Sequence, residues 1–328
     1  MGGSITCHSE YGHGTTFVVK ISQERLSDER IGDFKDRHRQ YMKERKTYKS
    51  KLCAPDVSVL VVDDNVMNLK VVKMMLKPTR MKVSTCASGA ECLELIKKYR
   101  YDIILMDHMM PEMDGMETFR RAMLMRDSLC GRSTYIVMTA NAVMGAREMY
   151  LAEGFKDYIS KPVQPEILED ILMRYIPEDK LVDPAVCGED RENTTRGAGT
   201  VDDTTDVMGK QDSDTSWKDV HIDHEKGLTY CGGSEDFLKE IISMYAADDK
   251  RAEIQKAFDE KDWDSYRILI HTVKSTSRTI GAMELGDEAQ ELENAVKELD
   301  VDMICKLHES AMASYSAVLD WCRVTTAH

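Results

Sequence analysis

The chain has 328 residues, of which 42% are hydrophobic and 31% charged, a balance typical of globular proteins, and its length suits two domains with linkers. Asp and Glu total 58 against 44 Lys and Arg, and the resulting formal net charge of −14 argues against a nucleic-acid-binding protein. No apolar run reaches the ~20 residues of a membrane span, and no signal peptide is recognisable, so we expect a cytoplasmic protein without a membrane segment. Nine cysteines without a C-x-x-C pair favour reduced thiols over a disulfide framework or a zinc site.

The N-terminal part divides into two pieces of different composition. Residues 1–22 contain two short β-like runs around the glycine-containing turn Tyr11-Gly12-His13-Gly14. The next segment is polar, with ten Lys or Arg and six Asp or Glu in residues 23–52. We therefore expect residues 23–56 to be a linker or an exposed helix.

Residues 57–177 alternate short apolar runs with amphipathic segments. The runs predict strands at 59–62, 81–86, 103–106, 135–138 and 155–159, and the segments between and after them predict helices at 67–77, 89–99, 115–126, 142–153 and 165–176. Strands that alternate with helices of about ten residues form right-handed βαβ units around a parallel sheet. The predicted fold class is therefore α/β, with a doubly wound five-stranded sheet.

Polar residues stand where these predicted strands end, and parallel sheets bind ligands at that edge. Asp63 and Asp64 follow the first strand, Asp107 the third, Thr139 the fourth and Lys161 the fifth. Three clustered carboxylates need a cation, and their oxygens suit Mg²⁺. A hydroxyl and an ammonium beside the metal would bind a phosphoryl group, which predicts attack by a carboxylate to form an aspartyl phosphate. The alternative is that each residue only caps the following helix.

The C-terminal part begins with an acidic stretch and continues as helices. Residues 178–214 hold eleven Asp or Glu and four Lys or Arg, which predicts a disordered linker over 178–216. Residues 217–325 have helical periodicity throughout. His221 to Glu225 resembles a metal-binding pattern, but we interpret it as an acidic helix cap.

One histidine of the helical part lies among cations. On a helix over 262–280, His271 shares an arc with Arg267, Lys274 and Arg278, opposite the apolar stripe, so we expect an exposed basic ridge. Neighbouring cations keep an imidazole neutral and attract a phosphoryl group. The alternative is a solvated basic face on which the histidine has no role.

The middle part closely resembles the bacterial response-regulator receiver domain. The resemblance rests on Val59 to Asn65, Leu105 to Gly115, Met138-Thr139-Ala140 and Lys161-Pro162. It implies a flavodoxin-like fold with strand order 2-1-3-4-5 and a cis bond before Pro162. It also implies that Asp107 is the phosphoacceptor and that Mg²⁺ is held by Asp63, Asp64, Asp107 and the main-chain carbonyl of Met109. Thr139 and Lys161 would contact the phosphoryl group, and Tyr158 would be the aromatic residue that turns inward when Thr139 shifts.

The helical part resembles histidine-phosphotransfer (HPt) domains, which are four-helix bundles. His271 to Ala282 carries the motif, Ile222 to Ser234 the usual beginning, and Leu285 to Ala295 the next helix. The resemblance implies that His271 carries phosphate and that Lys274 steadies it. Ser275 departs from the family, which normally has Gly there.

Residues 1–22 resemble the last two strands of a sensor-kinase ATPase domain, so the chain resembles the C-terminal part of a bacterial hybrid sensor histidine kinase. Twenty residues cannot enclose a nucleotide, so we expect no ATP-dependent kinase activity. The leading interpretation is a phosphorelay protein of two-component signalling that exchanges phosphate between Asp107 and His271. Its partners would be a sensor histidine kinase and a downstream response regulator or HPt protein. The alternative is a response regulator that acts through protein contacts of its switch face, with His271 unused.

Overall fold

The computed structural model describes residues 3–10, 14–20, 50–140, 146–183 and 220–326, and the chain forms two compact units, Met1–Lys46 and Thr47–His328. In the first unit, β1 (Ser4–Glu10) pairs antiparallel with β2 (Gly14–Lys20). This hairpin confirms the two predicted β-like runs. Segments 23–49 and 184–216 of the two predicted linkers lie outside the described residues.

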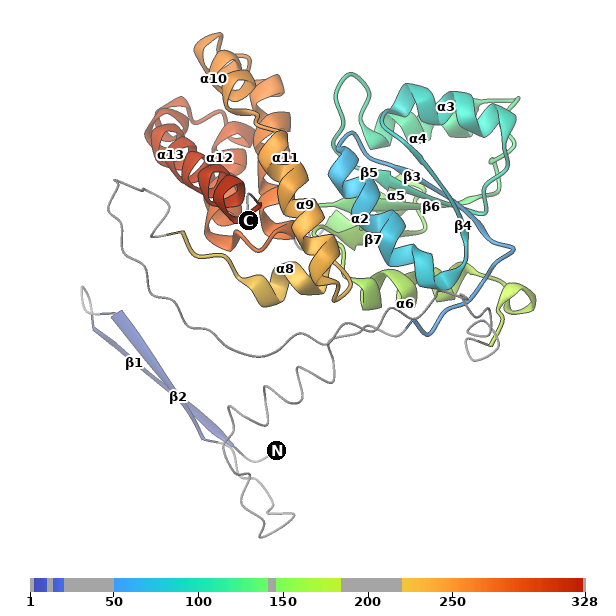
Figure 1. The fold of residues 1–328 in the computed structure, drawn as a ribbon, viewed down its shortest axis with the longest axis horizontal. Coiled ribbons are helices and arrows are strands. Elements are labelled where there is room, and N and C mark those ends of the chain that lie inside the picture. Colours follow the sequence, from blue (N-terminus) through green and yellow to red (C-terminus); the bar gives the residue numbers. More distant parts are fainter. Residues whose placement is uncertain (1–2, 11–13, 21–49, 141–145, 184–219, 327–328) are drawn as a thin grey trace, which may run out of the picture. The chain divides into compact units, whose positions relative to one another are not determined.

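The second unit opens with a five-stranded parallel sheet in the order β4-β3-β5-β6-β7, shown in Figure 1. Its strands are β3 (Ser58–Val62), β4 (Lys82–Cys86), β5 (Ile103–Asp107), β6 (Thr134–Thr139) and β7 (Asp157–Ser160). This order confirms the predicted doubly wound topology, and the bond between Lys161 and Pro162 is cis. The last strand begins two residues later than predicted because Phe155, although buried, packs on Phe119 from the preceding turn.

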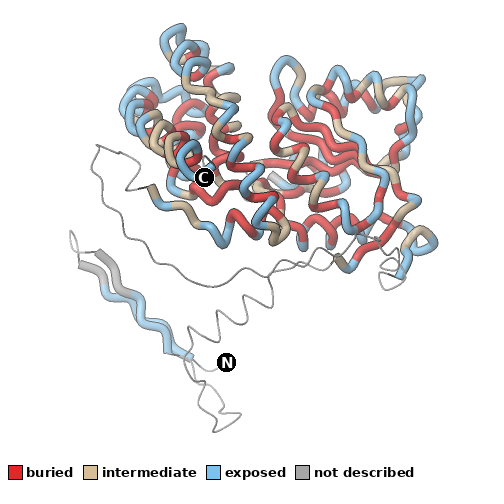
Figure 2. Tube along the Cα trace, viewed as in Figure 1, coloured by how far each residue is buried: buried red, intermediate tan, exposed pale blue. Residues whose placement is uncertain are grey.

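Helices cover both faces of this sheet. They are α2 (Val66–Leu76), α3 (Gly89–Lys98), α4 (Gly115–Leu124), α5 (Ala146–Glu153) and α6 (Pro165–Tyr175), with short 3₁₀ turns at Lys77–Thr79 and Glu178–Lys180. Asn65, Ser88 and Asp114 cap the first three helices through their side chains. Helices α2 and α6 pack on one face, and α3, α4 and α5 on the other. Strands β3, β5 and β6 are accordingly almost entirely buried between them (Figure 2), whereas β7 alternates between buried and half-buried residues and most of the edge strand β4 is exposed or half-buried.

The C-terminal part is all α, as predicted. It comprises α8 (His224–Tyr230), α9 (Glu235–Ala247), α10 (Arg251–Asp259), α11 (Trp263–Thr279), α12 (Met283–Lys297) and α13 (Val301–Thr326). Long helices α11, α12, α13 and α9 pack in that succession as a bundle. Asp223 caps α8 by accepting from the amide of Lys226, which confirms the predicted helix cap. No helix in the described ranges is both long and apolar enough to cross a membrane.

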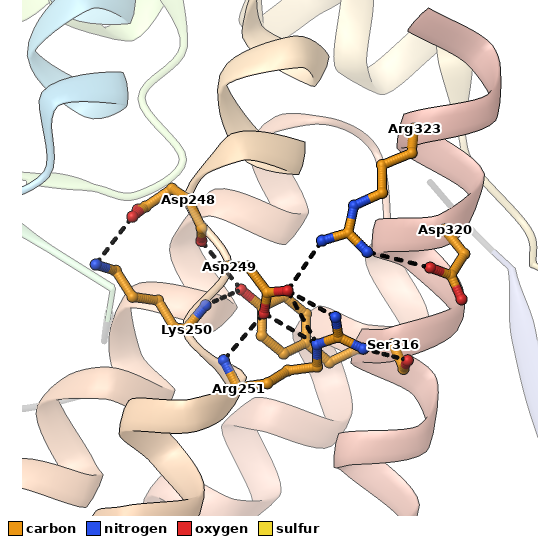
Figure 3. Close-up of polar contacts among 8 residues, drawn as sticks. Asp248, Asp249, Lys250, Arg251, Ser316, Asp320 and Arg323 are labelled. Atoms are coloured by element: carbon orange, nitrogen blue, oxygen red, sulfur yellow. Dashed lines mark hydrogen bonds and ion pairs between the residues drawn. The ribbon is translucent and has the colours of Figure 1, made fainter. Parts of the chain in front are cut away.

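An ionic cluster joins the start of α10 to α13 (Figure 3). Asp249 accepts from Arg251 at 2.6 Å and from Arg323 at 2.9 Å, while Arg251 also donates to Ser316 at 2.7 Å. These hydrogen bonds hold the pKa of the Asp249 carboxyl well below its usual range. The turn that carries the neighbouring Lys250 is therefore fixed against the bundle.

The sheet domain and the helical bundle contact each other within the second unit. Helix α2 lies against α9, and an ion pair joins Lys70 to Glu240. Beside this contact, a cleft of about 550 Å³ is lined by residues of both parts, among them Asp64, Pro111, Met244 and Lys250. The bundle therefore lies next to the edge of the sheet where the strands end.

Cysteines depart from the sequence-based expectation at one position. Seven of the described cysteines are free, whereas Cys53 is disulfide-bonded. The expectation of reduced thiols is therefore wrong for Cys53. Scattered spacing does not show which cysteines meet in space, because a disulfide depends on the distance and direction of the two side chains.

Candidate functional site

Three predicted carboxylates meet at the carboxyl edge of the sheet. Asp63 follows β3 directly and Asp107 ends β5, and both are buried, while Asp64 is half-buried. One oxygen of each of these carboxylates lies within 4.8 Å of the others. A converging set of hard oxygen donors of this size fits a divalent cation such as Mg²⁺.

Lys161 joins two of these carboxylates. Its Nζ lies 2.6 Å from Oδ2 of Asp63 and 2.8 Å from Oδ2 of Asp107, and it is itself buried. Oδ1 of Asp107 is buried too, but accepts no hydrogen bond in the described structure. One oxygen of Asp107 is thus held by the ammonium, while the other has no hydrogen-bond partner within the described residues.

The acidic cluster is electrostatically strained without a cation. Burial raises the pKa of Asp107 to about 8, and Asp63 adds to this, although Lys161 opposes it. Burial and the charge of Asp63 likewise raise the pKa of Asp64 to about 6. Burial acts to lower the pKa of Lys161, but the carboxylates of Asp107 and Asp63 outweigh it and raise that pKa. A bound divalent cation would favour the ionised carboxylates.

Two groups near the start of α2 orient Asp63, and one of them, the side chain of Asn68, was not identified from the sequence. Oδ1 of Asp63 accepts from the amide of Asn65 at 3.0 Å and from Nδ2 of Asn68 at 3.1 Å. Asn68 lies in the first turn of α2, so its contact depends on the position of the helix. Its only sequence signal is a polar residue one turn after the Asp pair.

The predicted phosphoryl contacts lie on neighbouring segments. Thr139 ends β6 and is buried, and its carbonyl accepts from the amide of Lys161 at 2.7 Å. The hydroxyl of Tyr150 donates to Oγ1 of Thr139 at 3.1 Å. Tyr158, the predicted switch residue, is half-buried on β7. Met109 is buried in the loop after Asp107, from which its carbonyl is proposed to reach a metal.

His271 does not lie on an exposed ridge, so that expectation is wrong. The side chain is only 5% exposed, and Lys274 is fully buried. The predicted buried stripe of this helix is confirmed apart from Leu269, which is half-buried; its other members are Tyr266, Ile270, Val273, Ser277 and Ile280. The face opposite the stripe is also covered, because α12 and the edge of the sheet domain pack against it.

A buried glutamate holds His271, and sequence reasoning missed it. Glu293 of α12 lies with Oε2 at 3.3 Å from Nδ1 of His271 and also pairs with Lys274, while Lys297 reaches its other oxygen at 2.6 Å. Nε2 of His271 is buried and has no partner in the described structure. The signal that could have found Glu293 is an acidic residue beside Leu292, within the buried stripe of α12.

This environment keeps the imidazole neutral. Burial lowers the pKa of His271 to about 4; Glu293 acts to raise it, and the charges of Lys274 and Lys161 lower it further. Burial likewise lowers the pKa of Lys274. Burial alone would raise the pKa of Glu293, but His271 and Lys274 hold that pKa well below its usual range. A neutral His271 with a bonded Nδ1 presents Nε2 as its nucleophilic atom.

The acidic cluster lies beside the helix that carries His271. A cavity of about 20 Å³ is bounded by Asp63, Lys161 and Pro162 on one side and by Ser275 and Thr279 of α11 on the other. Ser275 occupies the position where the resemblance predicts Gly, and its side chain forms part of the cavity wall. The acidic cluster and the histidine helix therefore share a boundary.

Comparisons with known proteins agree with both parts of the chain. The response regulator receiver domain matches residues 59–173, and the Hpt domain matches residues 245–321. The signal transduction histidine-protein kinase BarA of Shigella flexneri is 35% identical over 147 residues, 44% of this chain and 16% of BarA. Sensor protein GacS of Pseudomonas syringae is 25% identical over 248 residues, 73% of this chain and 24% of GacS.

Two further relatives extend these findings. The aerobic respiration control sensor protein ArcB of Escherichia coli is 28% identical over 175 residues, 53% of this chain and 21% of ArcB. The solved receiver domain of sensor histidine kinase PA1611 from Pseudomonas aeruginosa, which holds a magnesium ion, is 34% identical and covers 36% of this chain and 96% of that one, with a TM-score of 0.33. The chain spans a quarter or less of the lengths of BarA, GacS and ArcB. Residues 59–173 thus form a response regulator receiver domain and residues 245–321 an Hpt domain, a combination that supports a phosphorelay in two-component signalling.

Proposed function

We propose that this chain takes up a phosphoryl group on Asp107 and exchanges it with His271. The observation that supports this proposal is that the two reacting atoms are in the same state. Oδ1 of Asp107 and Nε2 of His271 are both buried, and both lack a hydrogen-bond partner in the described structure. Asp63 and Lys161, which neighbour Asp107, line one small cavity together with Ser275 and Thr279 of the helix that carries His271. Buried polar atoms are rarely left unpaired, so two such atoms in adjoining parts of the structure favour a group that passes between them.

In the first step, Oδ1 of Asp107 attacks the phosphorus of a phosphorylated donor, and the bond from phosphorus to the donor breaks. Lys161 holds Oδ2 and offsets the added negative charge, while Thr139 donates its hydroxyl to a phosphoryl oxygen. Asp63, Asp64, Asp107 and the carbonyl of Met109 would hold Mg²⁺, which when bound neutralises charge on the carboxylates and the phosphoryl oxygens.

In the second step, Nε2 of neutral His271 attacks the same phosphorus in line, and the bond to Oδ1 of Asp107 breaks. Oδ1 of Asp107 keeps the electron pair of the broken bond, and the carboxylate regains its negative charge beside Lys161. Glu293 accepts from Nδ1–H of His271 and stabilises the cationic character that the ring gains. Lys274 is bonded to Glu293 and is fully buried, so we assign it a role in fixing Glu293 rather than in contacting phosphate.

The donors and acceptors outside this chain follow from the same chemistry. We propose a sensor histidine kinase as the donor to Asp107, and a response regulator or another HPt protein as the downstream partner.

We propose the boundaries 57–177 for the receiver and 217–325 for the HPt domain. We also propose that residues 1–22 are a remnant of a kinase ATPase domain and that the protein is cytoplasmic.

The test is to incubate the full chain with Mg²⁺ and radiolabelled acetyl phosphate and to distinguish the products by lability. Hydroxylamine releases label from aspartate, and acid releases it from histidine. We expect label on both residues in the wild type, on Asp107 alone in His271→Gln, and on neither in Asp107→Asn or with excess chelator. Label on His271 in Asp107→Asn would contradict the order of transfer. Label that never reaches His271 would favour the response-regulator alternative.

A further inference from the structure

Tyr150 stands at the phosphorylation site although no sequence motif marks it. It lies on α5, and its side chain is 2% exposed. Its hydroxyl donates to Oγ1 of Thr139 at 3.1 Å. The edge of its ring meets the ring of His108, with centroids 5.4 Å apart and an interplanar angle of 71°. Tyr150 therefore contacts both Thr139 and the residue that directly follows Asp107.

The backbone ties these contacts to the reacting residues. The amide of His108 donates to the carbonyl of Met138, the residue before Thr139, at 2.9 Å. Burial raises the pKa of Tyr150 against the opposing effect of the hydrogen bond with Thr139, and the negative charge of Asp107 raises it further. A change at Asp107 thus reaches Tyr150 both through His108 and through Thr139.

We infer that Tyr150 is a positioning residue that holds Thr139 in its unphosphorylated arrangement and links it to α5. To serve an aspartyl phosphate, Thr139 must direct its hydroxyl toward a phosphoryl oxygen. The hydrogen bond from Tyr150 holds Oγ1 toward α5, so we expect this bond to break when Thr139 turns toward the phosphoryl group. This inference rests on the proposed phosphorylation of Asp107.

Tyr150 also connects Thr139 to exposed residues of α5. Tyr150 is buried, whereas Arg147, Glu148 and Met149 on the preceding turn are exposed. A movement of Thr139 that releases Tyr150 is therefore expected to change the orientation of these exposed side chains on α5. Tyr158, by contrast, forms its described hydrogen bond through its backbone amide, to Asp157.

The test removes one hydroxyl and measures affinity for a phosphoryl mimic. Beryllofluoride is added to the full chain with saturating Mg²⁺, and binding is followed by the NMR signals of α5. Loss of one neutral hydrogen bond from the unphosphorylated state should make Tyr150→Phe bind beryllofluoride about two- to tenfold more tightly than the wild type. The control is Tyr135→Phe, because Tyr135 is also 2% exposed but its hydroxyl has no hydrogen-bond partner in the described structure.

Thermal unfolding of both variants separates positioning from packing, since a purely structural role would lower stability without tightening the binding of the mimic. We expect Tyr135→Phe to bind beryllofluoride as the wild type does. Unchanged or weaker binding by Tyr150→Phe, with normal binding by the wild type, overturns the inference and leaves the proposed function intact. Failure of the wild type to bind beryllofluoride or to incorporate label overturns both.

Discussion

Glu293 is the residue on which the reactivity of His271 depends most directly. It is buried and bonded to His271, Lys274 and Lys297 at once. A hydrogen bond to a charged group contributes about 1.5–3 kcal/mol, so Glu293→Gln should slow transfer from Asp107 to His271 roughly 10- to 100-fold. Rapid quenching of the labelled full chain measures this rate. Label on Asp107 should form as in the wild type.

Glu291→Gln is the matched control for that change, because Glu291 lies on the same helix but is exposed. We expect it to transfer at the wild-type rate. Wild-type transfer in Glu293→Gln would show that Glu293 does not orient the imidazole.

Titration of His271 provides a second prediction at the residue scale. Burial and the charges of Lys274 and Lys161 lower its pKa to about 4 against the opposing effect of Glu293, whereas an exposed histidine has its pKa near 6.5. As the pH falls from 6.5 toward 4, the unfolded chain binds a proton that the folded chain does not. The free energy of unfolding should therefore decrease over this window, and less so in His271→Gln.

The imidazole proton signals of His271, assigned by their loss in His271→Gln, should titrate well below pH 6.5. A midpoint at or above 6.5 would mean that the ring is protonated in the folded protein, contrary to its proposed role as a neutral nucleophile. Urea unfolding of both proteins at several pH values measures the accompanying change in stability.

Helix α4 begins so close to β5 that its first residue must be glycine. A Cβ on Gly115 would lie 2.1 Å from the carbonyl oxygen of Asp107. Forcing atoms into a packed site costs about 1–3 kcal/mol, so Gly115→Ala should lower the free energy of unfolding by that amount and reduce labelling of Asp107. Urea unfolding and acetyl phosphate labelling measure the two effects.

Gly131 offers the control for this substitution, since nothing lies within 4 Å of the Cβ that Gly131→Ala would add. We expect that variant to be as stable as the wild type. If Gly115→Ala matched it in stability and labelling, the close approach of α4 to Asp107 would have no consequence.

The elements of the receiver were predictable because each carries a local signal. The strands are apolar runs bounded by polar residues, and Asn65, Ser88 and Asp114 provide capping side chains at the starts of helices. The convergence of Asp63, Asp64 and Asp107 followed from the rule that parallel strands end at one edge. Periodicity gave the correct apolar stripe of α11 as well.

The helical periodicity of the sequence could not predict how one helix packs on another or on the sheet domain. It classed the polar face of α11 as exposed, whereas His271 and Lys274 are buried and pair with Glu293 of α12, and Ser275 borders the sheet domain. Glu293 and Tyr150 were missed for the same reason, because their partners are distant in the sequence. A buried polar residue whose hydrogen-bond partners are distant in the sequence cannot be recognised from the residues of its own helix.

At the scale of the whole molecule, Asp107 and His271 belong to one compact unit, so we expect the proposed transfer to be intramolecular. After brief labelling of Asp107, appearance of label on His271 should follow first-order kinetics whose half-time does not change when the protein is diluted. Mixing labelled His271→Gln chains with Asp107→Asn chains should transfer label much more slowly than the wild type does. A half-time that lengthens on dilution would show that transfer occurs between chains.

The burial of His271 has a consequence for signal fidelity. Because its Nε2 is buried, we expect a receiver of another protein to reach this atom only in the fraction of molecules in which the helical bundle has moved away from the acidic cluster. The apparent affinity of His271 for any other receiver should then be lower than its intrinsic affinity by that fraction. Docking within the chain should thus reduce cross-talk, because a competing receiver must form contacts strong enough to hold the two domains apart.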